Sequence, residues 1–303
     1  MKKNVLISGG SGFVGKQLTS LLIEAGYSVS ILSRTKKQNT TDISYYHWDI
    51  TRFIIDEEAV LNANFIIHLA GENIAEKRWT TKRKTEILES RVQSTRLIYE
   101  VLKKNNKQLD AFISASGIGI YGAINGSEIC TESEPLINDF LGITCQKWEA
   151  AADQIESLKI RTVKIRTGLV LGKNEGFLKV ISPIFKYKLG SALGSGNQFM
   201  PWIHITDLCA IYLKAIEDIE MKGSYNAAIN DGTTNTIFSK TLAGVYGYSM
   251  WLPNIPEFII QTILGEMSLM VLKGRRVSSD KIEKTGFKFQ FVVLEKALKD
   301  CLL

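Results

Sequence analysis

The residues best suited to chemistry form a glycine-rich loop near the start of the chain. Glycines 9, 12 and 15 follow a short apolar strand and open a helical pattern. A backbone without Cβ atoms can contact a pyrophosphate, and a helix N-terminus presents unpaired N–H groups with a partial positive charge. We therefore expect a dinucleotide here rather than a plain turn. The expected contacts are Gly9, Ser11, Gly12, Phe13, Val14 and Gly15.

The end of the second strand, Leu32-Ser33-Arg34, indicates which dinucleotide is bound. A site for NAD usually has an acidic residue there, which binds the ribose 2′-OH. In this chain no acidic residue follows until Asp42, and a guanidinium suits a 2′-phosphate. We predict NADP as the cofactor, with NAD the less favoured choice, and a merely solvated Arg34 is the alternative.

Glycines, amides and aromatic residues meet in residues 194–204, a composition that suits a sugar-like or polar ligand. His204 titrates near neutrality if unperturbed, but it lies at a strand-to-helix junction, so a helix cap is the alternative to an acid–base role. Arg275 and Arg276 are a further cationic pair, suited to a substrate carboxylate or phosphate or simply to the surface. The expected substrate contacts are Glu72, Arg78, Trp79, Trp202 and His204.

Strands and helices alternate along the first half of the chain. Strands are expected at 5–7, 28–32, 44–48, 65–69, 111–115 and 162–165, and long helices at 80–104 and 140–155. This alternation predicts an α/β fold, a Rossmann-type doubly wound parallel sheet. Beyond Gly168, glycines and prolines punctuate shorter segments. We expect an NAD(P)-binding domain at 1–168 and a smaller C-terminal α/β substrate lobe at 169–303, parts of which return to the sheet.

Composition narrows the class of protein. In 303 residues, 37 Lys and Arg face 31 Asp and Glu, and the surplus of +6 is spread along the chain. With no basic arm and no apolar run near the ~18 residues of a membrane span, we expect a small-molecule substrate, not nucleic acid or a membrane. Four scattered cysteines are typical of reduced thiols, and the glycines from Gly9 onward interrupt the first apolar run too early for a signal peptide, so we expect a cytoplasmic protein. Three histidines far apart predict no metal site.

Several motifs together resemble the extended short-chain dehydrogenase/reductase superfamily, of the NAD(P)-dependent epimerase/dehydratase type. The chain is most similar to the atypical branch related to nucleoside-diphosphate-sugar epimerases. The motifs are Gly9–Gly15, His68–Ile74, Arg78–Thr80, Ser114–Ser116 with Tyr121–Gly122, Arg166–Gly168, Trp202–Ile205 with Asp207, and Gly274–Val277. The resemblance implies cofactor contacts at Asp49, beside the adenine, and at Leu69, Ala70, Gly71, Ser114, Arg166, Thr167 and Gly168. It also implies, by analogy, a homodimer through the two long helices.

The chain departs from this superfamily at the catalytic residues. Members use a Ser, a Tyr and a Lys, and the Y-x-x-x-K spacing lets the ammonium lower the pKa of the phenol. Ser116 follows strand 111–115 as expected, but Leu141 and Cys145 occupy the Tyr and Lys positions. Tyr99 and Lys103 have the spacing on the preceding helix, where we read them as a solvated face. Tyr121, in the loop after Ser116, is the candidate substitute, and a structural loop tyrosine is the alternative.

These observations predict an NADP-dependent oxidoreductase or epimerase-like enzyme for a polar, nucleotide-sugar type of substrate. Ser116 and Tyr121 would polarise its carbonyl or hydroxyl. The missing Tyr/Lys pair keeps open a catalytically silent NADPH-binding sensor or scaffold. A non-redox isomerase or lyase that retains the nucleotide is a third, weaker hypothesis.

Overall fold

A parallel β-sheet forms the centre of the computed structural model, which describes residues 2–35 and 37–303. Its strand order is β11-β8-β6-β5-β1-β2-β3-β4, and every neighbouring pair is parallel except β3 and β4. The strands are β1 (Asn4–Ser8), β2 (Ser28–Ser33), β3 (Ile43–Asp49), β4 (Ile54–Ile55), β5 (Phe65–His68), β6 (Ala111–Gly117), β8 (Thr162–Thr167) and β11 (Gly223–Ala227). This arrangement confirms the predicted doubly wound parallel sheet.

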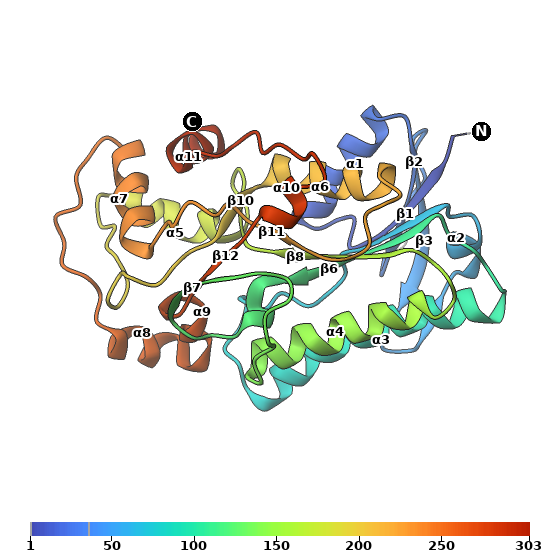
Figure 1. Cartoon of the computed structure of the whole chain (residues 1–303), viewed down its shortest axis with the longest axis horizontal. Helices are drawn as coiled ribbons and strands as arrows, with labels where there is room; N and C mark the ends of the chain where they lie inside the picture. The colour runs from blue at the N-terminus through green and yellow to red at the C-terminus, as the bar shows by residue number, and fades with distance from the viewer. Residues whose placement is uncertain (1, 36) are drawn as a thin grey trace.

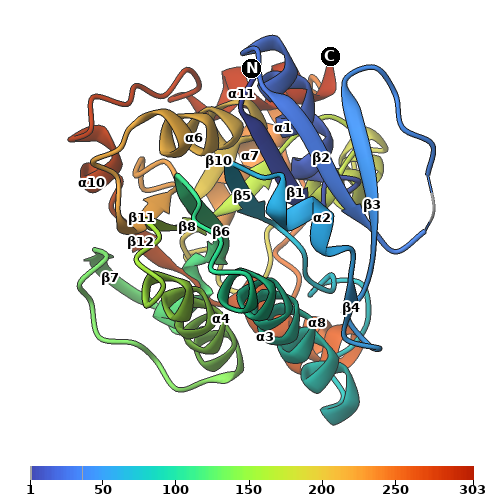
Figure 2. The same ribbon diagram turned by 90° about the vertical axis from the view of Figure 1, so that its right-hand side faces the viewer.

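Helices cover both faces of this sheet, as Figures 1 and 2 show. One face packs against α1 (Phe13–Glu24) and α6 (Ile205–Glu217), and the other against α3 (Thr81–Lys104) and α4 (Phe140–Glu156), with α2 (Glu57–Leu61) at its margin. Apolar side chains of β1 alternate between the two cores, Val5 and Ile7 on one side and Leu6 on the other. Strands buried on both faces read as continuous apolar runs, which is why they were visible in the sequence.

The helix boundaries follow from capping residues. Thr80, expected as the first residue of the long helix, is instead its N-cap, and its side chain accepts a hydrogen bond from the Arg83 amide. Asp139 caps α4 in the same way through the Gly142 amide. Each cap satisfies one of the amides that a helix N-terminus leaves without an intrahelical partner. Both caps fix where α3 and α4 begin beside the candidate site.

The C-terminal part of the chain builds a smaller lobe next to the carboxyl edge of the sheet (Figure 1). Its elements are β9 (Leu169–Leu171), β10 (Trp202–His204), β12 (Arg275–Val277), α5 (Gly176–Lys186), α7 (Asn235–Val245), α8 (Glu257–Leu264), α9 (Leu269–Leu272) and α11 (Leu294–Leu302). Strand β7 (Gly126–Cys130) comes from the first half of the chain, and α10 (Asp280–Glu283) packs on β11. Short 3-10 helices occupy Ile118–Tyr121 and Gly265–Ser268. Strands β9 and β10 pair in parallel, as do β7 and β12.

Three elements from beyond residue 168 belong to the main sheet rather than to the lobe, and one of them is α10, which packs on β11 through the buried Ile282. Strand β11 pairs with β8 at the sheet edge, and α6 packs on the face that α1 also covers. The lobe has its own core, formed by α5, α7, α11 and strands β9 and β10. The chain therefore leaves the sheet after β8, returns for α6 and β11, and returns once more with α10 before α11 completes the lobe.

Candidate functional site

The glycine-rich loop forms a backbone cradle between β1 and α1. Gly9 has a left-handed φ of 76°, and a Cβ built on it would lie 3.0 Å from the carbonyl carbon of Leu69. A Cβ on Gly15 would lie 2.6 Å from the Cα of Gly10 and would also overlap the Gly9 carbonyl oxygen. Gly12 is the N-cap of α1, and no side chain caps that helix. The loop thus leaves free amides at a helix N-terminus, which fits a pyrophosphate.

Phe13 connects this cradle to the lobe. A Cβ on Gly172 would lie 2.5 Å from the tip of the Phe13 ring, and Gly176 is the other glycine in contact with that ring. Only residues without side chains leave room for the phenyl group there. Phe13 therefore fixes the start of α1 against the loop between β9 and α5. Ser11 is exposed and Val14 is half-buried beside it.

A buried histidine supports the turn that passes the cradle. His68, the last residue of β5, has Nδ1 2.6 Å from Ser8 Oγ and Nε2 3.0 Å from Ser94 Oγ. The Ala70 amide donates to the same Ser8 oxygen over 3.3 Å. Burial lowers the pKa of His68 to about 3, so its ring is neutral at physiological pH. This contact ties β1, β5 and α3 together directly beneath Leu69–Gly71.

Arg34 lies at the end of β2 with 78% of its side chain exposed. Its Nη1 is 3.7 Å from Glu72, whose other oxygen accepts a hydrogen bond from Arg83 over 3.0 Å. Glu72, expected at the substrate, is therefore held beside Arg34 by a buried arginine. Asp49 accepts hydrogen bonds from the backbone and hydroxyl of Thr51, which keep its pKa below the usual range. Both Arg34 and Asp49 lie where β2 and β3 end.

The other expected substrate residues make structural contacts. Trp79 donates its ring N–H to the Ile74 carbonyl and is almost fully buried. Arg78 donates to the Thr262 carbonyl over 2.6 Å, which joins the turn region to the lobe. Trp202 is completely buried and donates to Asp231. No surface of Trp202 is open to a ligand, so a substrate contact there would require the lobe to open.

His204 adopts the capping role that the sequence left as the alternative. Its Nδ1 accepts a hydrogen bond from the Thr206 amide at the start of α6, and its ring lies 3.8 Å from that of Phe291. Its Nε2 is 3.2 Å from the Asp300 carboxylate. The side chain is 2% exposed, and burial lowers its pKa although Asp300 opposes the shift. The histidine therefore joins β10, α6 and the C-terminal helix.

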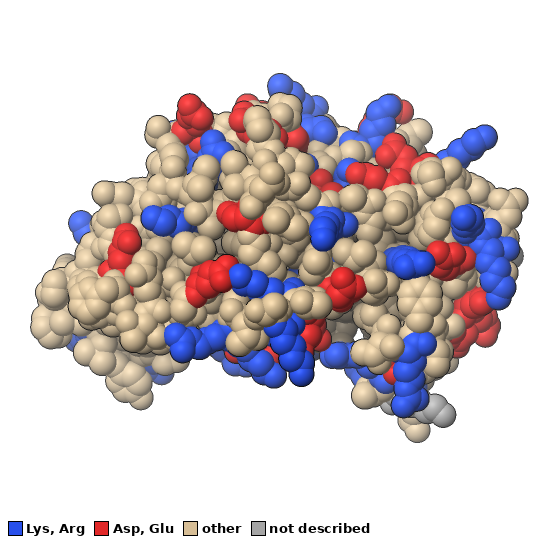
Figure 3. All heavy atoms as spheres, turned by 90° about the horizontal axis from the view of Figure 1, so that it is seen from below, with Lys and Arg blue, Asp and Glu red and all other residues tan. Residues whose placement is uncertain are grey.

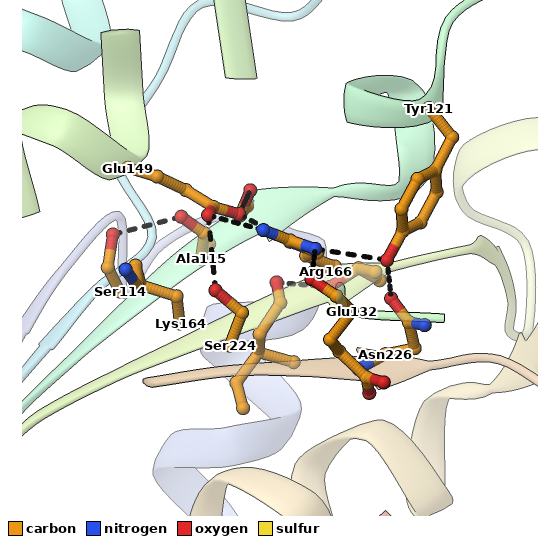
Figure 4. A network of polar contacts seen from close by, with 12 residues as sticks. Ser114, Ala115, Tyr121, Glu132, Glu149, Lys164, Arg166, Ser224 and Asn226 are labelled. Carbon is orange, nitrogen blue, oxygen red and sulfur yellow. Dashed lines mark hydrogen bonds and ion pairs between the residues drawn. The ribbon is translucent and has the colours of Figure 1, made fainter. Parts of the chain in front are cut away.

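A buried polar network occupies the carboxyl ends of β6, β8 and β11. Ser116 donates to Glu149 over 2.7 Å, and Arg166 binds both oxygens of that carboxylate at 2.8 and 2.9 Å. Arg166 also donates to the hydroxyl of Tyr121, which in turn donates to Asn226 over 2.7 Å. Figure 4 shows Arg166 between Glu149 and Tyr121. The network links helix α4 to three neighbouring strands.

The protonation states of this network follow from its geometry. Burial alone would raise the pKa of Glu149, but the hydrogen bonds from Arg166 and Ser116 outweigh burial and hold it below the usual range. Burial raises the pKa of Tyr121 to about 12 despite the adjacent Arg166. Glu149 is therefore ionised and Tyr121 is protonated near neutral pH. Because Ser116 donates its only proton to Glu149, its oxygen can only accept hydrogen bonds on its other side.

Leu141 and Cys145, which occupy the positions where the superfamily has Tyr and Lys, lie against the glycines that follow Ser116. A Cβ on Gly119 would be 3.3 Å from that of Leu141, and a Cβ on Gly117 would be 3.6 Å from the sulfur of Cys145. Burial, and then Glu149, raise the pKa of Cys145 to about 12, so it is a neutral thiol. Lys147 lines a different surface, the groove between α3 and α4. No acid–base pair of the usual type exists at this site among residues 2–35 and 37–303.

The remaining expected cofactor residues surround this point. Ser114 donates to the carbonyl of Ala115, and the Gly168 amide donates to Ala227. Thr167 is the last residue of β8, and a Cβ on Gly168 would lie 2.6 Å from the carbonyl oxygen of Pro201. The backbone after β8 is thus packed closely between β11 and the lobe.

Sequence reasoning did not identify the partners that make this network. The sequence did not reveal the roles of Glu149, Asn226 and Arg91. The available signal was the position of charged residues on otherwise apolar elements: Glu149 precedes a run of alanines on α4, and Arg166 lies near the end of the buried strand β8. A charge in such a place is seldom buried without a partner.

The surface adds little to this site. Figure 3 shows acidic and basic side chains interspersed on the face that carries α3, α4 and α8. In the described part of the chain, no helix combines the length and apolar character needed to cross a bilayer. No group of three or more His, Cys, Asp and Glu side chains within residues 2–35 and 37–303 could hold a metal ion.

Comparison with known proteins agrees with this geometry. Residues 5–228 match the NAD dependent epimerase/dehydratase family, and residues 255–301 match a domain of unknown function, DUF1731. The epimerase family protein YfhF of Bacillus subtilis is 34% identical over 300 residues, which cover 99% of this chain and 98% of that protein.

Two solved structures are also similar. The human epimerase family protein SDR39U1, crystallised with NADPH, superposes with a TM-score of 0.86 at 30% identity, covering 98% of each chain. A nucleoside-diphosphate sugar epimerase from Corynebacterium glutamicum superposes with a TM-score of 0.80 at 28% identity, covering 99% of this chain and 58% of that one. The chain belongs to the NAD dependent epimerase/dehydratase family, in its atypical extended short-chain dehydrogenase/reductase branch.

Proposed function

We propose that this protein binds NADP(H) and acts as an oxidoreductase or epimerase-like enzyme on a polar substrate of the nucleotide-sugar type. The observation that carries the proposal is the cradle of Gly9, Gly12 and Gly15, whose close contacts leave no room for Cβ atoms at Gly9 and Gly15. NADPH, which the human relative binds, fits this cradle, with Arg34 at the end of β2 beside the 2′-phosphate. Asp49 would lie near the adenine, as the resemblance implies.

The residues after β6 would orient the reacting group of the substrate. A bound nicotinamide supplies or accepts a hydride at a carbon that carries an oxygen. Ser116 Oγ donates to Glu149 and therefore presents lone pairs, which suit the O–H of an alcohol better than a carbonyl oxygen. Tyr121 uses its proton on Asn226 and accepts from Arg166, so its role is to hold Arg166 in place. Ser116 and Tyr121 were both expected to polarise the substrate. We now propose this contact for Ser116, as a hydrogen-bond acceptor, and not for Tyr121.

Arg275 and Arg276 support an anionic substrate. Both Nε atoms are buried, and neither has a hydrogen-bond partner among residues 2–35 and 37–303. Arg276 Nη2 donates to Asn230, which follows β11, and its guanidinium lies 5.9 Å from the centre of the Phe199 ring. Buried guanidinium donors without partners are costly, and a phosphate or carboxylate would satisfy them. A nucleoside diphosphate carries such groups.

A second candidate function is a catalytically silent NADPH sensor or scaffold. The specific observation in its favour is the apolar pair Leu141 and Cys145 beside Ser116, which has no group that titrates near neutral pH. Transfer of tritium from [4-³H]NADPH to a library of carbonyl compounds separates the two functions. Tight NADPH binding with no transfer to any compound would favour the sensor. The homodimer through α3 and α4 also remains a proposal, which sedimentation velocity can measure.

The cofactor proposal is tested by titrating the tryptophan fluorescence with NADPH and NADH, for the wild type and Arg34→Ala. We expect NADPH to bind the wild type more tightly than NADH and at least ~10-fold more weakly after the substitution, about 1.4 kcal/mol. Arg96→Ala is the matched control, because Arg96 is also exposed and contacts Glu100 on the same helix and the ring of Phe53, both away from the glycine-rich loop. No binding of either nucleotide by the wild type would refute the proposed function.

A further inference from the structure

Arg91, on helix α3, packs directly against the turn between β5 and α3. Its Nη1 donates to the carbonyls of Glu72 and Ile87, over 3.1 and 2.8 Å. A Cβ on Gly71 would lie 3.0 Å from the central carbon of the guanidinium. The glycine therefore makes room for the guanidinium at the point where the backbone passes the expected cofactor site.

The other side of the same guanidinium faces helix α4. Its central carbon lies 4.9 Å from the centre of the Trp148 ring, within range of a cation–π contact. It is also close enough to Cys145 to oppose the rise in the pKa of that thiol. Arg91 thus lies between Gly71, on the expected cofactor turn, and Trp148, which follows Cys145 by about one helical turn. Cys145 is the position at which the superfamily pattern has its lysine. A cation is present beside the position from which the ammonium is missing.

Much of the hydrogen-bonding capacity of this cation is unused. Among residues 2–35 and 37–303, none accepts a hydrogen bond from Nη2 or Nε of Arg91, although Arg91 is half-buried. The neighbouring Trp148 is 7% exposed, and its indole N–H is buried without a partner among the described residues. The free nitrogens of Arg91 are not themselves buried, so they are open to a ligand. A buried unpaired N–H is costly unless a ligand satisfies it. The guanidinium and this indole are in contact through the cation–π pair.

We propose that Arg91 is a cofactor-binding residue, which provides the positive charge missing at Cys145 and donates hydrogen bonds to the hydroxyls on the nicotinamide side of NADP(H). This inference rests on the proposed function, because it requires the dinucleotide to bind. A guanidinium keeps its proton at any pH that the protein tolerates, so Arg91 binds and orients but does not transfer protons. Its planar fork also differs from an ammonium in holding the Glu72 carbonyl with one nitrogen while the others remain free.

A purely structural Arg91 would instead only brace the turn, and two nucleotides distinguish the roles. NADPH would reach from the glycine-rich loop to the region around Ser116. In contrast, 2′,5′-ADP has the adenosine and the 2′-phosphate but no nicotinamide half. Binding of each is measured by calorimetry for the wild type, Arg91→Met, Arg91→Lys and Arg34→Ala. Arg96→Met is the control from the same helix, and circular dichroism confirms the fold of each variant.

We expect Arg91→Met to weaken NADPH about tenfold, the effect of one charge-assisted hydrogen bond, and to leave 2′,5′-ADP unchanged. Arg91→Lys should recover part of the loss, and Arg34→Ala should weaken both nucleotides. Unchanged NADPH binding in Arg91→Met, or an equal loss for both nucleotides, would overturn the assignment. If the wild type bound 2′,5′-ADP and NADPH with equal affinity, no contact to the nicotinamide half would exist and Arg91 would have no such role. If it bound neither, the proposed function itself would fail.

Discussion

The two ends of the candidate site, the glycine-rich loop and the region around Ser116, are built on different principles. At the adenosine and pyrophosphate end, Gly9, Gly12 and Gly15 shape the site by what they lack, and the ligand would meet backbone amides. At the Ser116 end, side chains shape the site, because Glu149 and Arg166 fill the space beneath it with a paired charge. The first end is local in sequence, whereas the second joins α4, β6, β8 and β11.

This difference explains why the glycine-rich loop keeps the superfamily pattern whereas the Ser116 end departs from it. A backbone cradle tolerates little change, since a side chain at Gly9 or Gly15 would crowd the main chain. A side-chain site can lose Tyr and Lys and still fold, provided that the remaining polar groups satisfy one another. Here Ser116, Glu149, Arg166 and Tyr121 hydrogen-bond to one another. The network therefore needs no Tyr or Lys at the positions of Leu141 and Cys145. Cofactor binding and conventional chemistry can therefore separate during evolution.

The largest loss of stability is expected from a substitution in the buried ion pair. Arg166→Met should lower the free energy of unfolding by about 3–5 kcal/mol, because it leaves the Glu149 carboxylate buried without its partner. The double variant with Glu149→Leu should recover much of that loss, since an apolar pair can replace a buried ion pair. Urea unfolding measures both. The exposed pair Arg96 and Glu100 is the control, and Arg96→Met should cost less than about 1 kcal/mol. A similarly small cost for Arg166→Met would show that the network does not hold the Ser116 end together.

The cradle is tested by Gly15→Ala. The new Cβ would lie 2.6 Å from the Cα of Gly10, so the backbone must move, and we expect a loss of about 1–3 kcal/mol in stability together with loss of NADPH binding. Gly244→Ala on α7 is the matched control, because no atom lies within 4 Å of its added methyl group. That control should be neutral or gain up to about 1 kcal/mol. Normal NADPH affinity in Gly15→Ala would contradict the cradle.

As the pH is lowered, the region around His68 should lose stability at a higher pH than the Ser116 end. The pKa of His68 is 6.5 in an ordinary environment and about 3 in the fold, so the unfolded chain binds more protons between these values. The free energy of unfolding should therefore fall as pH drops below 6.5, by up to about 1.4 kcal/mol per pH unit. Glu149 has a lowered pKa, so its contribution persists at pH values above 4.5 and is lost only at lower pH. Between pH 6.5 and 4.5 the two buried histidines, His68 and His204, should lower the stability, whereas the Glu149 network should not.

Denaturant titrations of the wild type and His68→Gln over that pH range measure this effect. The variant should be less stable at pH 7 and should show a flatter dependence on pH. His47→Gln is the control, because His47 is exposed on β3, and it should keep the wild-type slope. Parallel curves for the wild type and His68→Gln would show that burial of His68 does not set the acid sensitivity.

The fold was predictable from the sequence because its signals are local. Apolar runs such as Val5–Ile7 and Phe65–His68 mark strands buried on both faces, and the spacing of Gly9, Gly12 and Gly15 marks the turn between a strand and a helix. Thr80 illustrates the limit of such signals, since its capping role moved the helix boundary by a single residue.

The side-chain network was not predictable in the same way. Tyr121 and Asn226 are 105 positions apart, and nothing near either of them in the sequence indicates the other. In the sequence, Arg91 looks like any other arginine of the long helix. What distinguishes it from Arg96 is the packing of its side chain against Gly71 and Trp148. Trp202 was expected at a ligand because its neighbours are polar, yet the strand β10 directs it into the core of the lobe. Tertiary contacts decide these cases.

The return of β11 to the main sheet has a consequence for synthesis. While residues up to about 200 have emerged from the ribosome, β8 forms the edge of the sheet and the face that α6 later covers is open to water. An exposed edge strand and an uncovered apolar face invite pairing with other chains. The nucleotide-binding half therefore cannot finish folding ahead of the lobe, and the nascent chain depends on residues 205–227 to close its own aggregation-prone edge.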